Sequence, residues 1–234
     1  MNTYRKTAVI AGVLFILATL TGPLLATPLT PKLTGADTLA GISAQMNQMN
    51  QAAGGVLLWI ISHFTGCGIA IALYAVLKER NAGLALGAVI FRALEAAFYM
   101  VGTVCLLALL TLGQRFTAAG ATDRAALQAI GDLLVSVRDH AGLLAVFAFC
   151  AGAFMYYTLL FQSRLIPRWL SGFGIVAIIS MLTACVLAVF SGNRITSYIP
   201  LAAPIFAQEI VLGVWLIVKG FNPAAVAALS ARQS

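Results

Sequence analysis

The stretch Phe91-Arg92-Ala93-Leu94-Glu95-Ala96-Ala97-Phe98-Tyr99 places an arginine and a glutamate near the middle of an apolar run over residues 82–112. Such a run exceeds the roughly 20 residues that an α-helix needs to cross a bilayer. On a helix, Arg92, Glu95 and Tyr99 recur at i, i+3 and i+7 and share one face. One charge at the centre of a membrane helix costs roughly 2.5–3.5 kcal/mol, so this face must contact protein or enclosed water rather than lipid.

The composition of the whole chain also points to a membrane. Hydrophobic residues make up 61% of the 234 residues and charged residues only 9%. Soluble domains are about 45–50% apolar and about 25% charged, and a soluble fold of this size has too little interior for the excess. The apolar runs are continuous rather than alternating, which excludes the pattern of a membrane β-barrel. We therefore predict an all-α, polytopic membrane helix bundle that forms a single domain over residues 1–234.

Six transmembrane helices are expected. They occupy approximately residues 8–26, 54–78, 82–112, 140–162, 169–190 and 200–218. The first run is interpreted as a retained span rather than a cleaved signal peptide, because it is long for such a segment and Leu24 and Ala26 form a poor cleavage site. Pro23, Pro28 and Pro31 are expected to break its helix and lead into a polar loop.

Two longer connections each contain an apolar stripe at helical spacing, which predicts a short amphipathic helix in each outer loop. The first helix starts with Asp37 as a candidate N-cap and extends to about residue 51; its stripe is Leu39, Ile42, Met46 and Met49. The second starts after Thr122; its stripe is Leu127, Ile130, Leu134 and Val137. The first helix either lies on the membrane surface or covers the bundle, and the second either stands alone or continues into the fourth span.

Basic residues near the span ends predict the orientation, because cytoplasmic loops are enriched in lysine and arginine. With the N-terminus inside, the inner side holds the larger group: Arg5, Lys6, Lys78, Arg80, Arg164, Arg168, Lys219 and Arg232. The outer side then holds the smaller group: Lys32, Arg115, Arg124, Arg138 and Arg194. Both termini are therefore expected in the cytoplasm.

Four polar residues are expected at similar depths in the membrane. At 1.5 Å per helical residue, His63 and Glu209 both lie roughly 13 Å from the outer face. Arg92 and Glu95 lie roughly 15–20 Å from the inner face by the same estimate. Together with Tyr99, these residues form a candidate polar site at mid-depth, in which no residue can be assigned as catalytic.

The two acids and one arginine of this site leave one acid without a partner. Arg92 pairs with either Glu95 or Glu209, because buried charges persist only when paired. The remaining acid favours its neutral, proton-carrying form in a low-dielectric interior. Such a group suits proton-coupled transport or acid catalysis on a lipid-soluble substrate, while an ion pair that only fixes helix packing is the structural alternative.

The other reactive side chains give weaker signals. Cys67, Cys105, Cys150 and Cys185 are isolated within apolar runs, so neither a disulfide framework nor a zinc site is expected. A haem held by His63 and His140 is disfavoured, because their depths differ by roughly 10 Å. No cofactor or metal is therefore expected. The formal net charge of +7 is scattered over helix ends, which fits membrane topology and argues against a nucleic-acid partner.

Three stretches resemble a known family. They are Ser163-Arg-Leu-Ile-Pro-Arg-Trp-Leu-Ser-Gly-Phe-Gly174, Gln208-Glu-Ile-Val-Leu-Gly-Val-Trp-Leu-Ile-Val-Lys-Gly-Phe221, and the segment from Phe91 to Ala96. With the span order, they are similar to a bacterial integral membrane family catalogued as domain of unknown function 4386. The resemblance implies a small multi-span protein of a bacterial inner membrane, and it brings no activity and no catalytic residues.

Three functional hypotheses follow from these observations. The first is a membrane protein whose polar site binds or transports a small lipophilic or weakly acidic molecule. The second is an intramembrane acid–base enzyme acting on a lipid or isoprenoid, and the third is a non-catalytic structural protein or membrane partner. Whether the chain is an enzyme is left open, and the expected partners are membrane lipids and a small-molecule ligand.

Overall fold

The described part of the protein is an all-α bundle with six long helices. The computed structural model describes residues 3–31, 38–44 and 49–230, and these residues contain no strand. The helices are α1 (Thr3–Thr19), η1 (Leu20–Ala26), α2 (Thr27–Leu29), α3 (Thr38–Ala44), α4 (Met49–Leu77), α5 (Ala82–Ala118), α6 (Ala121–Ser163), α7 (Arg168–Ser191), η3 (Ile195–Tyr198), α8 (Ile199–Val218) and α9 (Pro223–Ser230).

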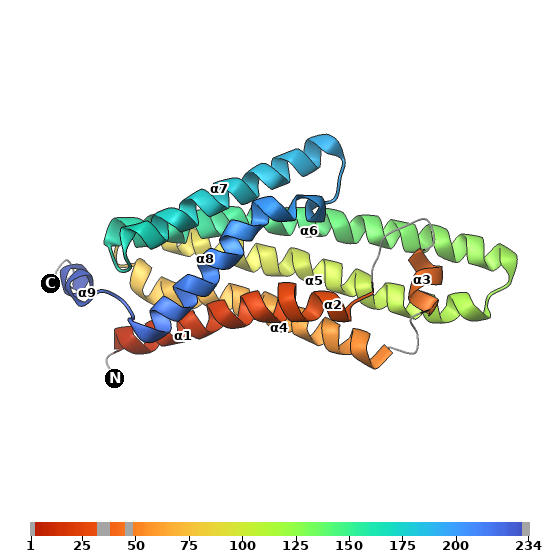
Figure 1. The fold of residues 1–234 in the computed structure, drawn as a ribbon, viewed down its shortest axis with the longest axis horizontal. Helices are drawn as coiled ribbons and strands as arrows, with labels where there is room; N and C mark the ends of the chain where they lie inside the picture. Colours follow the sequence, from red (N-terminus) through yellow and green to blue (C-terminus); the bar gives the residue numbers. More distant parts are fainter. Residues whose placement is uncertain (1–2, 32–37, 45–48, 231–234) are drawn as a thin grey trace.

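The long helices form a closed ring. Each packs against its neighbours in the order α1, α4, α5, α6, α7 and α8, and α8 returns to α1. Both ends of the chain lie at the same end of the bundle, and the hairpin of α5 and α6 extends beyond the other helices at the opposite end (Figure 1). This arrangement brings residues from the two ends of the sequence into the same interior as those of α4 and α5.

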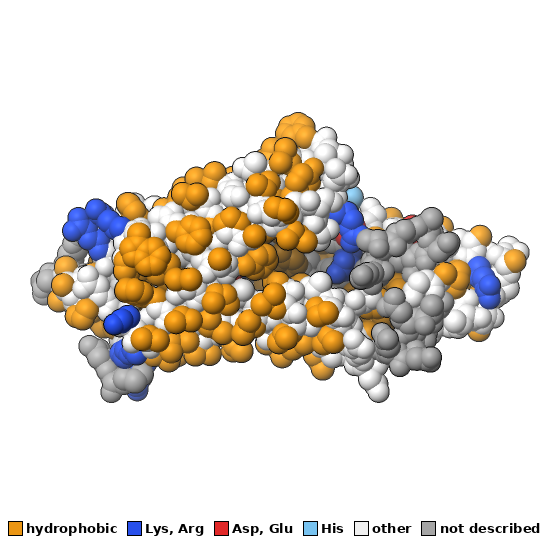
Figure 2. Space-filling view, in the orientation of Figure 1, with side chains coloured by type: hydrophobic (Ala, Val, Ile, Leu, Met, Phe, Trp, Pro, Cys, Tyr) orange, Lys and Arg blue, Asp and Glu red, His pale blue; other side chains and the backbone are white. Residues whose placement is uncertain are grey.

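The outer surface of this ring is apolar. Large side chains such as Phe64 and Phe190 are 63% and 87% exposed. Hydrophobic side chains cover the body of the molecule, and lysine and arginine side chains gather at the end that carries the termini, with smaller groups between the middle and the opposite end (Figure 2). Six helices are long and apolar enough to cross a membrane. The chain is therefore a multi-pass membrane protein whose exposed apolar side chains face lipid.

The loop helices differ in detail from the expectation. The stretch with Leu127, Ile130, Leu134 and Val137 is the first part of α6, which continues without a break into the fourth span. The first amphipathic segment contains α3, whose Leu39 and Ile42 are buried against α5 and its neighbours. These contacts place α3 on the bundle. Asp37, the candidate N-cap, and Met46 lie outside the described residues.

The prolines of the first span do not end its helix where the sequence suggested. Pro23 lies inside the π-helical segment η1, Pro28 lies inside α2, and helical structure continues to Leu29. A π turn shifts the backbone hydrogen bonds by one residue, which relieves the clash of a proline ring with the carbonyl four residues before it. Membrane helices accommodate proline by such local adjustments. The expectation of a helix break at Pro23 and Pro28 was therefore wrong.

Two glycines set the crossing of α1 and α8. A Cβ atom on Gly12 would lie 2.7 Å from the Gly213 carbonyl oxygen, and one on Gly213 would lie 3.0 Å from the Gly12 carbonyl oxygen. The two backbones therefore approach closely, and the side chains of Ile16 and Ile217 pack against the two glycines. Small residues at such crossings let membrane helices approach closely, which strengthens their van der Waals contact.

The variant Gly12→Ala is expected to lower the free energy of unfolding by about 1–3 kcal/mol, because the added methyl group overpacks this crossing. Gly142→Ala in α6 is the matched control, since a Cβ there meets nothing within 4 Å. The control should be neutral or more stable by up to about 1 kcal/mol, because alanine favours a helix over glycine. Thermal unfolding of both variants in mild detergent checks this, and equal melting temperatures would contradict it.

Candidate functional site

Arg92 is buried at the centre of the bundle and is held by three helices. The residue belongs to α5, and its side chain is 3% exposed. Its Nη1 atom lies 2.6 Å from Glu95 Oε2 on the same helix, and its Nε donates to the Gly66 carbonyl of α4 at 3.1 Å. The guanidinium lies over the Phe149 ring of α6, 4.8 Å from the ring centroid. These contacts provide charge, hydrogen-bond and cation–π partners in a region without bulk water.

Gly66 makes room for this arginine. A Cβ atom at this position would lie 2.8 Å from Arg92 Nη2, closer than non-bonded atoms approach. The glycine therefore lets the guanidinium reach the backbone carbonyl of α4. The sequence predicted the spacing of Arg92 and Glu95, but it did not predict the contact of Arg92 with Gly66 on the neighbouring helix.

Glu209 brings a second carboxyl group into the interior from α8. The residue is 7% exposed, and its Oε2 accepts a hydrogen bond from Thr19 Oγ1 of α1 at 3.0 Å. No ion pair joins it to a basic side chain in the part of the chain that the structure describes, whereas Arg92 is paired with Glu95. Arg92 is nevertheless close enough to Glu209 for the two charges to attract each other. The interior thus holds two acids around one arginine.

The hydrogen-bond partner of Glu209 lies beside the irregular part of the first span. Thr19 is the last residue of α1, directly before η1. Around it, Thr21 Oγ1 donates to the Leu17 carbonyl at 2.7 Å, and Ser62 Oγ of α4 donates to the Ala18 carbonyl at 2.8 Å. The bond from Ser62 ties the polar turn to α4, and the bond from Thr21 lies within the first span. Single π turns inside helices are frequent at functional sites.

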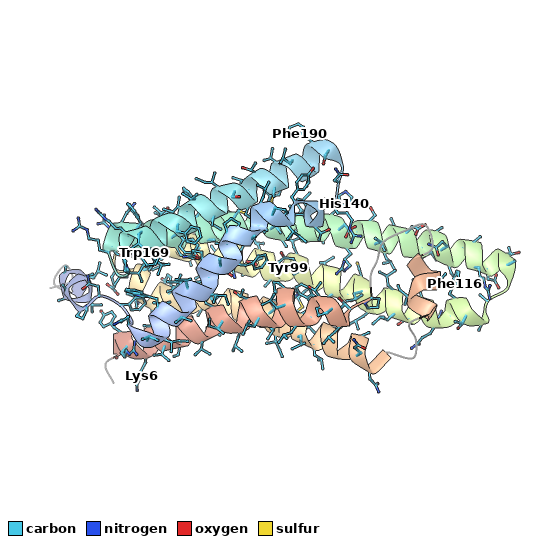
Figure 3. The ribbon with its side chains drawn as sticks, viewed as in Figure 1. Lys6, Tyr99, Phe116, His140, Trp169 and Phe190 are labelled. Carbon is cyan, nitrogen blue, oxygen red and sulfur yellow. The ribbon has the colours of Figure 1, made fainter. Side chains whose placement is uncertain are left out.

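His63 and Tyr99 lie in an aromatic stack between α4 and α5. Their rings are 4.9 Å apart and nearly parallel, at 5°. Trp59 also stacks with His63, with ring centroids 5.7 Å apart, and His63 Nε2 lies 3.4 Å from Thr103 Oγ1. Tyr99 lies near the middle of the bundle's length (Figure 3). The stack adjoins the charged pair, because Tyr99 lies within electrostatic reach of Glu95 and Arg92.

The candidate residues therefore lie in two adjoining groups. Arg92, Glu95, Tyr99 and His63 are arranged along the interface of α4 and α5, while Glu209 meets Thr19 where α8 crosses α1. His140 lies elsewhere. Its ring is exposed, and its Nδ1 donates to the Ser136 carbonyl of its own helix at 2.7 Å.

Several buried polar groups near Glu209 were not singled out from the sequence. The Tyr157 hydroxyl of α6 donates to Gln208 Oε1, and Gln208 Nε2 donates to the Leu170 carbonyl of α7 at 3.2 Å. The Tyr156 ring lies 4.5 Å from the Tyr157 ring, and both are fully buried. The sequence features that could have identified these groups are two adjacent tyrosines in one apolar run and a glutamine directly before Glu209 in another.

The described interior lacks a cluster of metal ligands. Among the described residues, no group of three or more His, Cys, Asp or Glu side chains could hold a metal ion. Cys67, Cys105, Cys150 and Cys185 are all free thiols. The polar groups that remain are a guanidinium, two carboxyls, hydroxyls and an imidazole, and this set can bind anions and transfer protons.

The fold and this interior define a polytopic α-helical membrane protein with ionisable residues buried among its six spans. The chain belongs to the family described as "Domain of unknown function (DUF4386)", whose profile matches residues 10–220. The family expected from the sequence is thereby confirmed. No curated protein and no solved structure matches the chain.

Proposed function

We propose that this protein is a proton-coupled transporter of a small lipophilic or weakly acidic molecule in a bacterial inner membrane, with both termini in the cytoplasm. The observation that supports the proposal is the presence of two buried acids around one buried arginine. Arg92 is paired with Glu95, and among the described residues Glu209 accepts a hydrogen bond from Thr19 and forms no ion pair. A lone carboxylate at mid-membrane costs roughly 2.5–3.5 kcal/mol, so a proton on one acid stabilises the closed interior.

In this proposal Arg92 exchanges partners. When Glu209 carries the proton, Arg92 pairs with Glu95, as the distances describe. When the proton moves to Glu95, that side chain becomes neutral and Glu209 becomes the negatively charged partner of Arg92. The attraction between Arg92 and Glu209 then draws α8 toward α5. A weak acid entering the site competes as an anion for Arg92. Two packings that differ in the position of one proton provide the two states that alternating access requires.

The experiment uses the purified protein in proteoliposomes with an imposed pH gradient and two probe acids, octanoate and benzoate. We expect the protein to raise the initial rate of gradient-driven probe uptake above the rate in protein-free vesicles, with the probe recovered unchanged by mass spectrometry. A chemically altered probe would favour the intramembrane enzyme. If the protein accelerates the uptake of neither probe and a native mass spectrum in mild detergent carries no bound small molecule, a structural role becomes the better explanation.

A further inference from the structure

A basic groove opens at the end of the bundle that carries both chain termini. The groove has a volume of about 630 Å³. One wall is the turn between α6 and α7, and the other is the turn between α8 and α9. The residues that line it include Arg164, Arg168 and Lys219 but no aspartate or glutamate.

Two tight turns build this groove. Arg164 ends α6 in the left-handed conformation, with φ of 56°, and Gly220 follows α8 with φ of 73°. The backbone N–H of Asn222 donates to the Leu165 carbonyl at 2.8 Å, which joins the two turns. The backbone that carries the groove cations is thus held by two tight turns and by the hydrogen bond between them.

Among the described residues, the groove cations have no acidic partners. In the described part of the chain, none of Arg164, Arg168 and Lys219 forms an ion pair, and the guanidinium of Arg168 lies 5.2 Å from the centroid of the Phe161 ring. A fourth cation nearby is already engaged. Arg5 donates to the carbonyl groups of Leu216 at 3.2 Å and Ile217 at 2.6 Å, at the C-terminal end of α8.

Tryptophans place the groove at the level of the lipid headgroups. Trp215 lines the groove, and its ring contacts Trp169 edge to face, with centroids 6.4 Å apart. Trp169 is 60% exposed and lies toward the end of the bundle that carries the termini (Figure 3). Tryptophan is enriched at the membrane–water interface, and Val218 beside the groove is 62% exposed on the lipid-facing surface. The basic groove is therefore continuous with a surface suited to acyl chains.

We propose that this groove binds the headgroup of an anionic phospholipid. Arg164, Arg168 and Lys219 surround the phosphate, and the acyl chains lie along Trp169 and the exposed apolar side chains of α7 and α8. Basic pockets between membrane helices are the usual sites for such headgroups. Unpaired cations favour a lipid of net negative charge over a zwitterionic one, and the apolar surface beside them favours a lipid over free phosphate. The proposal does not depend on the transport function.

Native mass spectrometry in mild detergent tests this site. The protein is titrated with phosphatidylglycerol and with phosphatidylcholine of the same acyl chains, and we expect tighter binding of phosphatidylglycerol. The triple variant Arg164→Gln, Arg168→Gln, Lys219→Gln should weaken phosphatidylglycerol binding by about 100-fold, at about fivefold for each cation removed. Binding of phosphatidylcholine, which carries the same phosphate but no net charge, should weaken less than binding of phosphatidylglycerol.

The matched control is a second triple variant with the same loss of charge: Lys6→Gln, Lys78→Gln, Arg80→Gln. These residues belong to the same basic end but do not line the groove. The affinity of the control for phosphatidylglycerol should stay within about threefold of that of the unchanged protein. This change is smaller than the loss expected when one groove cation is removed. If thermal unfolding shows that the groove variant is not folded, the single variant Lys219→Gln replaces it. Its affinity for phosphatidylglycerol should fall about fivefold.

Three outcomes would overturn the proposal. Equal losses in the two triple variants would mean that surface charge in general attracts the lipid. Equal binding of both lipids to the unchanged protein would remove the role of the cations. Displacement of phosphatidylglycerol by an equal concentration of inorganic phosphate would assign the groove to a free anion instead of a lipid.

Discussion

Replacing Arg92 with methionine is expected to lower the free energy of unfolding by about 3–5 kcal/mol, because it leaves the carboxyl of Glu95 without its counter-charge. The arginine is 3% exposed, and its Nη1 atom lies 2.6 Å from Glu95 Oε2. Its bond to the Gly66 carbonyl and its contact with the Phe149 ring are lost in the same variant. Reversible unfolding in mixed micelles, followed by the loss of helical signal, measures the change.

The double variant Arg92→Met, Glu95→Met separates the charge from the packing. Apolar side chains of similar volume often replace a buried ion pair without loss of stability. We therefore expect the double variant to regain most of the stability that the single variant loses. If the double variant were as unstable as the single one, the contacts to Gly66 and Phe149 would hold the helices together, and the ion pair would contribute little.

The sequence predicts geometry within a helix better than contacts between helices. The spacing of Arg92 and Glu95 follows from the 3.6-residue period alone, and the structure places their charged atoms within ion-pair distance. The neighbours of a membrane helix depend on how similar apolar surfaces fit together, and many sequences satisfy such a fit. The bond between Thr19 and Glu209 joins residues 190 positions apart, and neither residue's own surroundings in the sequence indicate the other.

Helix ends and irregular turns were also hard to predict. Pro23 reads locally as a helix breaker, but the neighbouring helices hold the segment helical through a π turn. The stripe from Leu127 to Val137 gives the same pattern whether the helix stops or continues into the fourth span. Glu209 itself was identifiable, because an acid in the middle of an apolar run is unusual whatever its neighbours are.

Glu209→Gln is expected to abolish the protein-dependent, gradient-driven uptake of the probe acid while leaving the fold intact. Glutamine has nearly the same shape as glutamate, and its side-chain oxygen can still accept the hydrogen bond from Thr19. It cannot carry a proton across the pH range of the experiment, so uptake should fall to the level of protein-free vesicles. Uptake in proteoliposomes with an imposed pH gradient measures the loss, and thermal unfolding of the same sample confirms that the bundle is folded.

Glu79→Gln is the matched control, because it makes the same chemical change in the turn between α4 and α5, outside the polar site. It should accumulate the probe as the unchanged protein does. If Glu209 carries the coupled proton, Glu209→Gln should lose uptake and keep its melting temperature. If Glu209 only supports helix packing, uptake and melting temperature should change together. If Glu209→Gln lowers the melting temperature sharply, the carboxylate acts as a second counter-charge for Arg92. If Glu95→Gln and Glu209→Gln each retain full uptake, neither acid carries the coupled proton, and the transport proposal fails at its central residues.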